Sequence, residues 1–277
     1  MKKYGSRVAL WPTDFTVIRD DAASASAESV GMSKPTFLLV HGSWQASWSW
    51  EPVRARLQAA GYRTLAPTLP GHAPSADRAA VSFADYELSV LRVLDHEAEG
   101  PVVLVGHSFG GAIISRIAEL RPGRCHGLVY YSGFVPRDGE SVADNLPTAF
   151  LEVIRQLSAS SADGSIALPY EPFRAAFVNT ADEPAARALY AQLTPEPYMP
   201  IFAPLALPHN HRHGIPAAFV ACRHDLSLGP GVFHPGQSRR LDRPRLIEID
   251  GDHEALLTNP DALADALLTA VATESVV

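Results

Sequence analysis

The sequence predicts an α/β fold: a mostly parallel sheet of about six strands with flanking helices, and a helical cap inserted after the fourth strand. Short, continuously apolar runs alternate along the chain with longer segments whose apolar residues recur at helical spacing. Strands that are apolar throughout are buried on both faces, which is typical of a parallel sheet covered by helices. In addition, about 80 residues without a strand separate the fourth and fifth apolar runs, and this is too long for a loop in a compact domain.

The apolar pattern and the residues that bound it define each element. Gly61 ends the first helix, the third helix ends before Pro122, and Asn259-Pro260-Asp261 begins the last one. The strands are expected at Thr36–Val40, Tyr62–Ala66, Val102–Val105, Leu128–Tyr131, Ala217–Ala221 and Arg245–Ile249. The core helices are expected at Trp50–Ala60, Phe83–Glu97, 109–120 and Ala262–Val271, and those of the insertion at Ala149–Gln156 and Pro184–Gln192.

The chain divides into a core, a cap and an N-terminal extension. Residues 35–136 and 214–277 form the predicted core, and residues 137–213 form the predicted helical cap. Eleven of the 23 prolines lie from Pro136 to Pro216. Because proline fixes φ and interrupts helices, we expect a cap of short helices joined by stiff turns.

Residues 1–34 form the predicted extension. Its apolar run, Val8–Trp11, has four residues, whereas a secretory signal needs roughly 7–15. We therefore expect no signal peptide and a cytoplasmic protein. Two interpretations of the extension remain open. Either Arg7–Leu10 and Phe15–Arg19 form a short edge hairpin, or the natural start is Met32 and the preceding segment is a poorly ordered linker.

Composition excludes several classes of partner. Acidic residues number 30 and basic residues 23, for a net charge of −7, so no basic stripe is available for nucleic acid. No apolar run approaches the roughly 20 residues that span a bilayer, so no membrane association is expected. The two cysteines, Cys125 and Cys222, exclude a disulfide framework and a four-cysteine zinc site. We expect a small-molecule ligand and no cofactor or metal; monomer and homodimer both remain open.

A motif for nucleophilic chemistry follows the third strand. Gly106-His107-Ser108-Phe109-Gly110 matches Gly-x-Ser-x-Gly, in the strand–turn–helix context that this motif requires. The glycines permit a strained turn that presents the Ser108 hydroxyl above the sheet. The helix that begins at Phe109 directs its amino end to the same place, which favours a developing negative charge. Ser108 is therefore the candidate nucleophile.

A serine hydroxyl needs a base, which an open parallel sheet places at the carboxyl end of a strand. His253 follows the sixth strand by four residues and is the candidate base. Its carboxylate partner is expected to be Asp225, after the fifth strand, with Asp138, after the fourth, as the rival. Asp252 is adjacent to His253 in the chain and badly placed to reach the ring.

Two backbone N–H groups are expected to hold an oxyanion. One belongs to Phe109, directly after the nucleophile, and the other to Ser43, in the loop after the first strand. Trp44, beside Ser43, is a candidate pocket residue. Cap aromatics that could line a pocket are Phe150, Phe173, Phe177, Tyr190, Tyr198 and Phe202.

One histidine-rich stretch falls outside this constellation. His209-Asn210-His211-Arg212-His213 alternates imidazoles, as a metal site can. The sequence places no carboxylate cluster beside it, and Pro208 and Gly214 border it. We therefore expect a solvated loop where the cap returns to the core.

These residues make the chain resemble the α/β-hydrolase superfamily over residues 36 to about 272. More narrowly, the stretch from His41 to Trp50 resembles the His-Gly-x-x-x-x-x-Trp-x-Trp opening of the plant methylesterase and hydroxynitrile lyase family and its bacterial esterase relatives. Residues 134–141 resemble the strand-to-cap joint of that family, and Gly251-Asp252-His253 also fits. The resemblance implies one core domain with a helical cap over the serine.

Two positions separate esterases from lyases within the resemblance. The cyanohydrin lyases have threonine where this chain has Gly42, and a lysine for departing cyanide where this chain has Glu254. A carboxylate would repel cyanide, so lyase activity is not expected. Esterases of the family commonly have an apolar residue at the second position. Glu254 therefore either indicates a polar or cationic group nearby or points to solvent.

The sequence thus predicts a serine carboxylesterase that acts on a small to medium organic ester through an acyl-enzyme on Ser108. Lactone or thioester cleavage by the same residues remains an alternative. A ligand-binding protein of the same fold, with no turnover, is the alternative from a different class.

Overall fold

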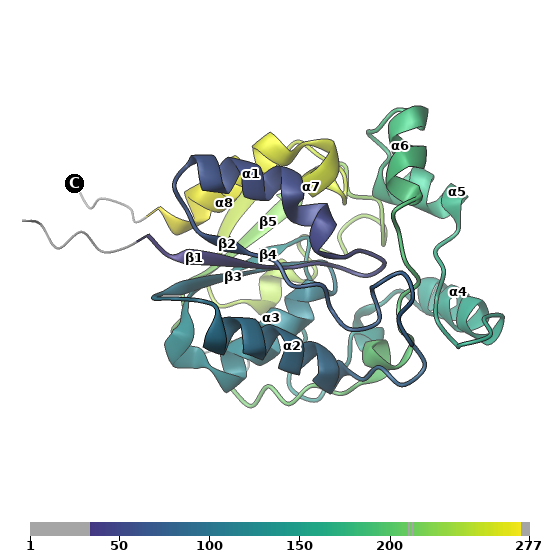
Figure 1. Cartoon of the computed structure of the whole chain (residues 1–277), viewed down its shortest axis with the longest axis horizontal. Coiled ribbons are helices and arrows are strands. Elements are labelled where there is room, and N and C mark those ends of the chain that lie inside the picture. Colours follow the sequence, from purple (N-terminus) through teal and green to yellow (C-terminus); the bar gives the residue numbers. More distant parts are fainter. Residues whose placement is uncertain (1–33, 210, 212, 273–277) are drawn as a thin grey trace, which may run out of the picture. The chain divides into compact units, whose positions relative to one another are not determined.

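A computed structural model describes residues 34–209, 211 and 213–272. The edge hairpin and the linker expected before residue 34 lie outside these residues. Within them, six strands form one parallel sheet in the order β2-β1-β3-β4-β5-β6 (Figure 1). The strands are β1 Thr36–Val40, β2 Thr64–Leu65, β3 Val102–His107, β4 Cys125–Tyr131, β5 Ala217–Cys222 and β6 Arg245–Ile249. The predicted class of fold is confirmed.

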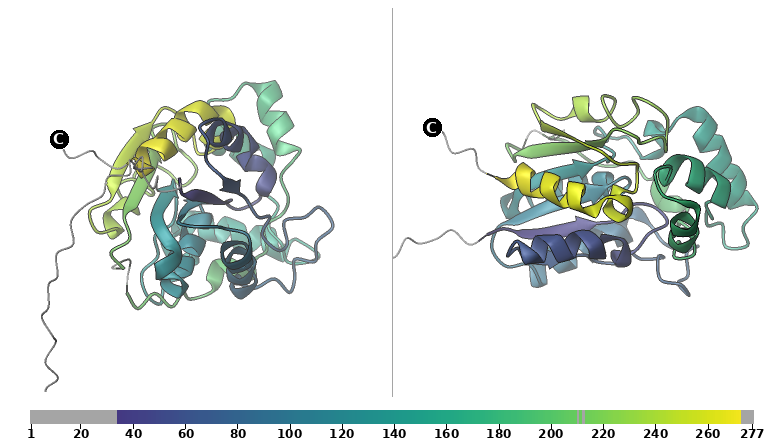
Figure 2. Two further views of the ribbon diagram at one scale, coloured as in Figure 1. Left: turned by 60° about the vertical axis from the view of Figure 1, so that its left-hand side comes forward. Right: turned by 90° about the horizontal axis from the view of Figure 1, so that it is seen from above.

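Helices cover both faces of the sheet (Figures 1 and 2). On one face α1 packs against α7 and α8, and on the other α2 packs against α3. These helices are α1 Glu51–Ala59, α2 Phe83–His96, α3 Gly110–Leu120, α7 Ala255–Thr258 and α8 Pro260–Val271.

The strands are buried on both faces, so their side chains alternate between two apolar cores. In β1, Phe37 and Leu39 belong to the core under α1 and α8, whereas Leu38 and Val40 belong to the core under α2 and α3. All five residues of β1 are buried. This explains why the strands read as continuous apolar runs.

A third group of helices lies between β4 and β5 in the chain, beyond the carboxyl ends of the strands (Figures 1 and 2). It contains α4 Thr148–Ala159, α5 Tyr170–Pro172, a π-helical turn Phe173–Phe177, α6 Glu183–Tyr190 and a 3-10 turn Met199–Phe202. These helices are short and separated by prolines, as the proline pattern predicts. They place a second layer of side chains over the end of the sheet where the candidate site residues lie.

The differences from the predicted elements have simple reasons. The strand expected at Tyr62–Ala66 shrinks to Thr64–Leu65, because β2 is an edge strand paired with β1 alone. Helix α7 has four residues, too few for a periodic signal. Across the described part of the chain, no helix combines the length and the apolar character that crossing a membrane requires.

Candidate active site

The candidate nucleophile Ser108 occupies the sharp turn between β3 and α3. Its φ of 49° lies in the left-handed region that side chains rarely adopt. The turn closes tightly, because a Cβ at Gly106 would lie 2.5 Å from the carbonyl oxygen of Gly110. A Cβ at Gly110 would in turn lie 2.5 Å from the carbonyl oxygen of Val40. Both glycines are therefore required for Ser108 to stand above the end of the sheet.

The candidate base and acid are brought together at the ends of β6 and β5. His253 Nδ1 lies 2.8 Å from Asp225 Oδ2, and both side chains are buried. Asp225 Oδ1 also accepts the N–H and the hydroxyl of Ser227, at 3.0 and 2.6 Å. The Ser227 hydroxyl lies 3.1 Å from His253 Nδ1 as well. The carboxylate is thus fixed on one side by Ser227 and on the other by the imidazole.

Charge sets the protonation states of this pair. Burial by itself raises the pKa of Asp225, but the charge of His253 and the hydrogen bonds from His253 and Ser227 outweigh it and bring the pKa to about 2. Burial lowers the pKa of His253, but the Asp225 carboxylate outweighs it and leaves that pKa above its ordinary value. Asp225 is therefore ionised and holds a proton on Nδ1 of His253. This leaves Nε2 as the basic atom of the ring.

Asp225, and not the rival Asp138, is the acid bonded to His253. Asp138 Oδ1 accepts the N–H of Leu207 at 2.7 Å, at the joint between core and cap. Asp252, expected to be unable to reach the ring of His253, bonds elsewhere: its Oδ2 accepts the hydroxyl of Thr180 at 2.6 Å.

The expected oxyanion donors flank Ser108. Among the described residues, the backbone N–H groups of Ser43 and Phe109 have no hydrogen-bond acceptor. The peptide that carries the Ser43 N–H is held from its other side, because His41 Nδ1 bonds the carbonyl oxygen of Gly42 at 2.8 Å. The N–H of Leu69 bonds His41 Nε2 at 3.0 Å, which requires that the proton of a neutral His41 lie on Nδ1. Burial, followed by the charge of His72, lowers the pKa of His41 and keeps it neutral.

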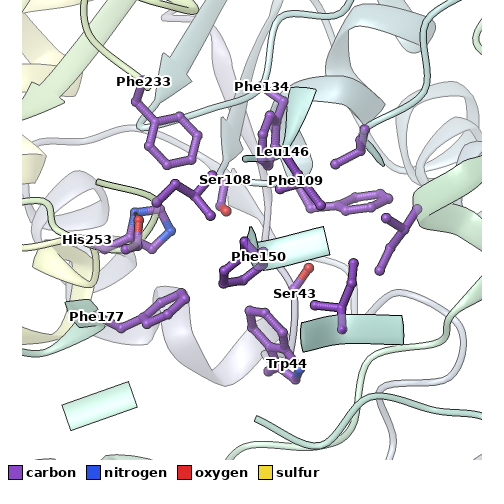
Figure 3. A pocket seen from close by; sticks show the side chains of 15 residues that line it. Ser43, Trp44, Ser108, Phe109, Phe134, Leu146, Phe150, Phe177, Phe233 and His253 are labelled. Carbon is purple, nitrogen blue, oxygen red and sulfur yellow. Dashed lines mark hydrogen bonds between the residues drawn. The ribbon is translucent and has the colours of Figure 1, made fainter. Parts of the chain in front are cut away.

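A cavity lies above Ser108, between the core and the cap. Figure 3 shows the Ser108 hydroxyl and the His253 ring facing it, surrounded by the rings of Phe150, Phe177 and Phe233. Its polar lining residues are Ser43, Ser108, Ser227 and His253, and its apolar ones are Trp44, Phe109, Phe134, Val142, Leu146, Phe150, Ile154, Phe177, Ile201, Leu228 and Phe233. Among the described residues that line it, His253 alone is titratable.

Two of the candidate cap aromatics line this cavity, and the other four do not. Phe150 and Phe177 line the cavity, and Trp44 lines it from the core side. The other four candidates are absent from the cavity lining and pair with one another. Their ring centroids lie 5.6 Å apart in Phe173–Tyr190 and 4.6 Å apart in Tyr198–Phe202.

The structure decides between the two interpretations of Glu254. The idea that it points to solvent is wrong, since the residue is 4% exposed. It does not line the cavity either, because its carboxylate contacts Gln45 Nε2 behind the loop that carries Ser43. Burial raises the pKa of Glu254 to about 7, although the His253 charge works in the opposite direction. The expected polar group near Glu254 is therefore present, and it is the Gln45 side chain of the protein itself and not a group of a substrate.

Two groups of described side chains have the atoms to hold a metal ion. His107, His253 and Glu254 form a buried group, and Glu119, His209 and His213 form the other; within each, the ligand atoms lie within 4.8 Å of one another. The second group corrects the expectation of a histidine-rich loop without a carboxylate. Glu119, on α3, accepts from His209 Nδ1 at 2.5 Å and from His213 Nε2 at 2.7 Å.

Two polar residues of the site were missed at the level of sequence. Ser227 follows Asp225 by two positions, a spacing at which a hydroxyl commonly bonds an aspartate, so a local signal existed. Glu196 stands between Pro195 and Pro197, and nothing in that context indicates that it is buried against the loop after β1.

The chain is similar to known proteins in its family model and in its curated relatives. Residues 37–266 match the model of the family described as "Alpha/beta hydrolase family". Over 118 residues the chain is 37% identical to the carbendazim hydrolyzing esterase of a Nocardioides species, a match that covers 41% of this chain and 48% of that enzyme. Over 255 residues it is 26% identical to salicylic acid-binding protein 2 of Nicotiana tabacum, covering 84% of this chain and 95% of the relative.

A solved structure matches most of the described chain. An extracellular alpha/beta-hydrolase from a Paenibacillus species superposes with a TM-score of 0.82 at 33% identity, covering 86% of this chain and 99% of that one. That protein is described as sharing structural and functional homology with the tobacco salicylic acid-binding protein 2.

Proposed function

Because the chain belongs to the alpha/beta hydrolase family, we propose that it is a serine esterase that cleaves carboxylic esters through an acyl-enzyme on Ser108. The observation that carries the proposal is the 2.8 Å contact between His253 Nδ1 and Asp225 Oδ2, beside a cavity that Ser108 and His253 line together. The relative from Nocardioides, named an esterase, supports the same class of reaction.

The proposed reaction has two halves. His253 Nε2 takes the proton of Ser108 as the oxygen attacks the ester carbonyl, and the tetrahedral intermediate collapses when His253 returns that proton to the leaving alcohol. In the second half a water gives a proton to His253 and its oxygen to the acyl carbon. The bond between the acyl carbon and Ser108 Oγ then breaks, and His253 returns its proton to Oγ, which releases the acid and restores Ser108. Asp225 stays ionised throughout and stabilises the imidazolium that forms twice in each cycle.

The backbone N–H groups of Ser43 and Phe109 are the proposed oxyanion donors. Both have no acceptor among the described residues, so they can donate to the carbonyl oxygen as it gains charge. Helix α3 begins directly after Phe109, and its positive end favours the same charge. These contacts strengthen in the transition state, which is what raises the rate.

The cavity supports an uncharged substrate with apolar groups on one or both sides of the ester. Its lining is aromatic and aliphatic apart from three serines and His253. A charged substrate group would lose its hydration there without gaining a partner. Lactones and thioesters with apolar substituents fit the same description, and a series of esters, lactones and thioesters of graded size separates them.

Two features support an esterase over a hydroxynitrile lyase. A Cβ at Gly42 would lie 3.0 Å from the Cβ of Ser108, which disfavours the threonine that the lyases carry at this position. Glu254 offers a carboxylate where the lyases have a lysine, and it faces Gln45.

The direct test uses p-nitrophenyl acetate. We expect a burst of p-nitrophenol followed by slower turnover, and neither from Ser108→Ala. A protein that binds small apolar molecules tightly but shows no Ser108-dependent release would instead be a receptor or carrier of the same fold.

The acid is tested in the same assay. Asp225→Asn is expected to lower kcat about 10⁴-fold, because the amide no longer holds the correct tautomer of His253. Asp138→Asn is the matched control and is expected to retain kcat. A loss with the second variant and not the first would contradict the assignment of Asp225.

A further inference from the structure

One carboxylate of the cap segment reaches the loop that carries Ser43. Glu196 is 1% exposed, and its Oε2 accepts the backbone N–H of Trp44 at 3.1 Å. The same oxygen lies 2.8 Å from His72 Nε2, and Oε1 accepts the hydroxyl of Tyr86 at 3.0 Å. Burial and then the charge of Glu196 raise the pKa of Tyr86, which keeps this hydroxyl a donor. A buried carboxylate with three donors is fully satisfied and fixed in place.

The residue bonded to Glu196 is held in a strained conformation. Trp44 has a φ of 64°, in the left-handed region that a large side chain rarely adopts. The cap segment holds Trp44 at two further points: its carbonyl oxygen accepts the N–H of Thr194 at 2.9 Å, and its indole N–H donates to the carbonyl oxygen of Ile166 at 2.8 Å. A strained backbone conformation persists only where surrounding groups enforce it, and the groups that hold Trp44 belong to the cap segment.

A second route leads from Glu196 to the Ser43 peptide. His72 Nδ1 lies 3.1 Å from the carbonyl oxygen of Pro70, and its Nε2 lies 2.8 Å from Glu196 Oε2, so the ring is held between two acceptors. The His72 ring packs edge-on against the ring of His41, with centroids 4.9 Å apart. His41 in turn bonds the carbonyl oxygen of Gly42, in the same planar peptide as the Ser43 N–H.

We propose that Glu196 is a positioning residue that fixes the direction of the Ser43 N–H, so that the oxyanion site is complete only when the cap segment is seated. This inference rests on the proposed function, since it concerns the oxyanion of the same reaction. Glu196 touches no substrate. It acts through Trp44 on one side of the Ser43 peptide and through His72 and His41 on the other.

The test separates positioning from simple stabilisation. In Glu196→Gln we expect kcat per active site, titrated through Ser108, to fall about 10- to 100-fold, less than complete loss of an oxyanion donor costs. KM is expected to change by less than about threefold, because Glu196 lines no part of the cavity and the Trp44 indole keeps its bond to the carbonyl oxygen of Ile166. The matched control is Glu171→Gln, an exposed cap carboxylate, which is expected to retain both constants.

Inhibitors report on the oxyanion itself. A trifluoromethyl ketone with an apolar chain adds to the serine and places its oxyanion on the donors, so its Ki is expected to rise in Glu196→Gln by the factor lost in kcat/KM. The secondary alcohol of the same chain forms no adduct, and its Ki is expected to stay constant. Tyr86→Phe, which keeps the carboxylate and removes one of its donors, is expected to show the same pattern more weakly.

The outcomes are distinguishable. If wild type shows no Ser108-dependent hydrolysis, the proposed function fails and this inference fails with it. If wild type is active and a folded Glu196→Gln retains kcat and the Ki of the ketone, only the inference is overturned. If Glu196→Gln does not fold, Tyr86→Phe decides, and unchanged kcat and ketone Ki in that variant overturn the inference.

Discussion

Glu254 places a second carboxyl group immediately behind the candidate base. Burial raises its pKa to about 7, while its negative charge, next to that of Asp225, contributes to the raised pKa of His253. Ionised Glu254 therefore favours the protonated form of His253, and protonated His253 favours the ionised form of Glu254. A neighbour that touches no substrate thus influences when the base is free to accept a proton.

The pH dependence of kcat/KM follows from this pair. Activity requires unprotonated His253, so kcat/KM is expected to rise with pH, with a midpoint above the ordinary histidine value of 6.5. In Glu254→Gln the negative neighbour is gone, so the midpoint is expected to move to lower pH. Exposed Glu248→Gln serves as the control and is expected to keep the wild-type midpoint. A midpoint that stays or rises in Glu254→Gln would contradict the coupling.

Among the elements, the turn from β3 into α3 brings three segments of backbone into close contact near the site. The register pairs Val40 of β1 with Gly106 of β3, and the amino end of α3 packs directly on this pair. Side chains at the glycines would push α3 away from the sheet, and Ser108 would move with it. The position of the candidate nucleophile is therefore set by contact between backbones.

Gly110→Ala tests this contact. The added methyl group would lie 2.5 Å from the Val40 carbonyl oxygen, so we expect the free energy of unfolding to fall by about 1–3 kcal/mol and the esterase rate to fall with it. Gly123→Ala is the control, because a Cβ there meets no atom within 4 Å. Urea unfolding measures both variants, and equal stabilities would show that α3 can shift without cost.

At the scale of the whole described chain, Asp252 ties three segments together. It is fully buried, and its Oδ2 accepts the N–H and the hydroxyl of Thr180, which follows the π-helical turn of the cap. Its Oδ1 accepts the N–H of Glu254 and the hydroxyl of Thr258 in α7. One carboxylate thus connects the cap, the loop that carries His253, and the helix behind it.

Asp252→Ala is therefore expected to affect the stability of the fold. It leaves buried donors unsatisfied, so we expect a loss of about 2–4 kcal/mol in the free energy of unfolding. Asp265→Ala, on the exposed face of α8, is the control and is expected to change stability by less than about 0.5 kcal/mol. Denaturant unfolding followed by circular dichroism measures both. A small loss with Asp252→Ala would mean that water replaces the carboxylate.

The sequence predicts features that depend on residues close together in the chain. Patterns of a few residues predict the strands and the Gly-x-Ser-x-Gly turn, and each of Ser108, Asp225 and His253 follows shortly after a predicted strand. The structure brings these three residues to one edge of the sheet. Buried polar pairs between distant segments carry no such signal. Glu196 meets Trp44 across 152 positions, and Glu254 meets Gln45 across 209.

Residues 194–197 of the cap segment are seated between two loops of the core. In the loop between β2 and α2, Arg78 donates to the carbonyl oxygen of Pro195 at 3.1 Å, and a Cβ at Gly71 would lie 2.5 Å from Cγ of Pro197. In the loop after β1, the carbonyl oxygen of Trp44 accepts the N–H of Thr194 at 2.9 Å. In a chimaera that takes its cap from a relative, the segment that replaces residues 194–197 would therefore not fit against the two core loops of this chain. Recombination breakpoints that keep these loops with the cap are the ones that should yield active hybrids, so new specificity is to be sought by exchanging these segments together.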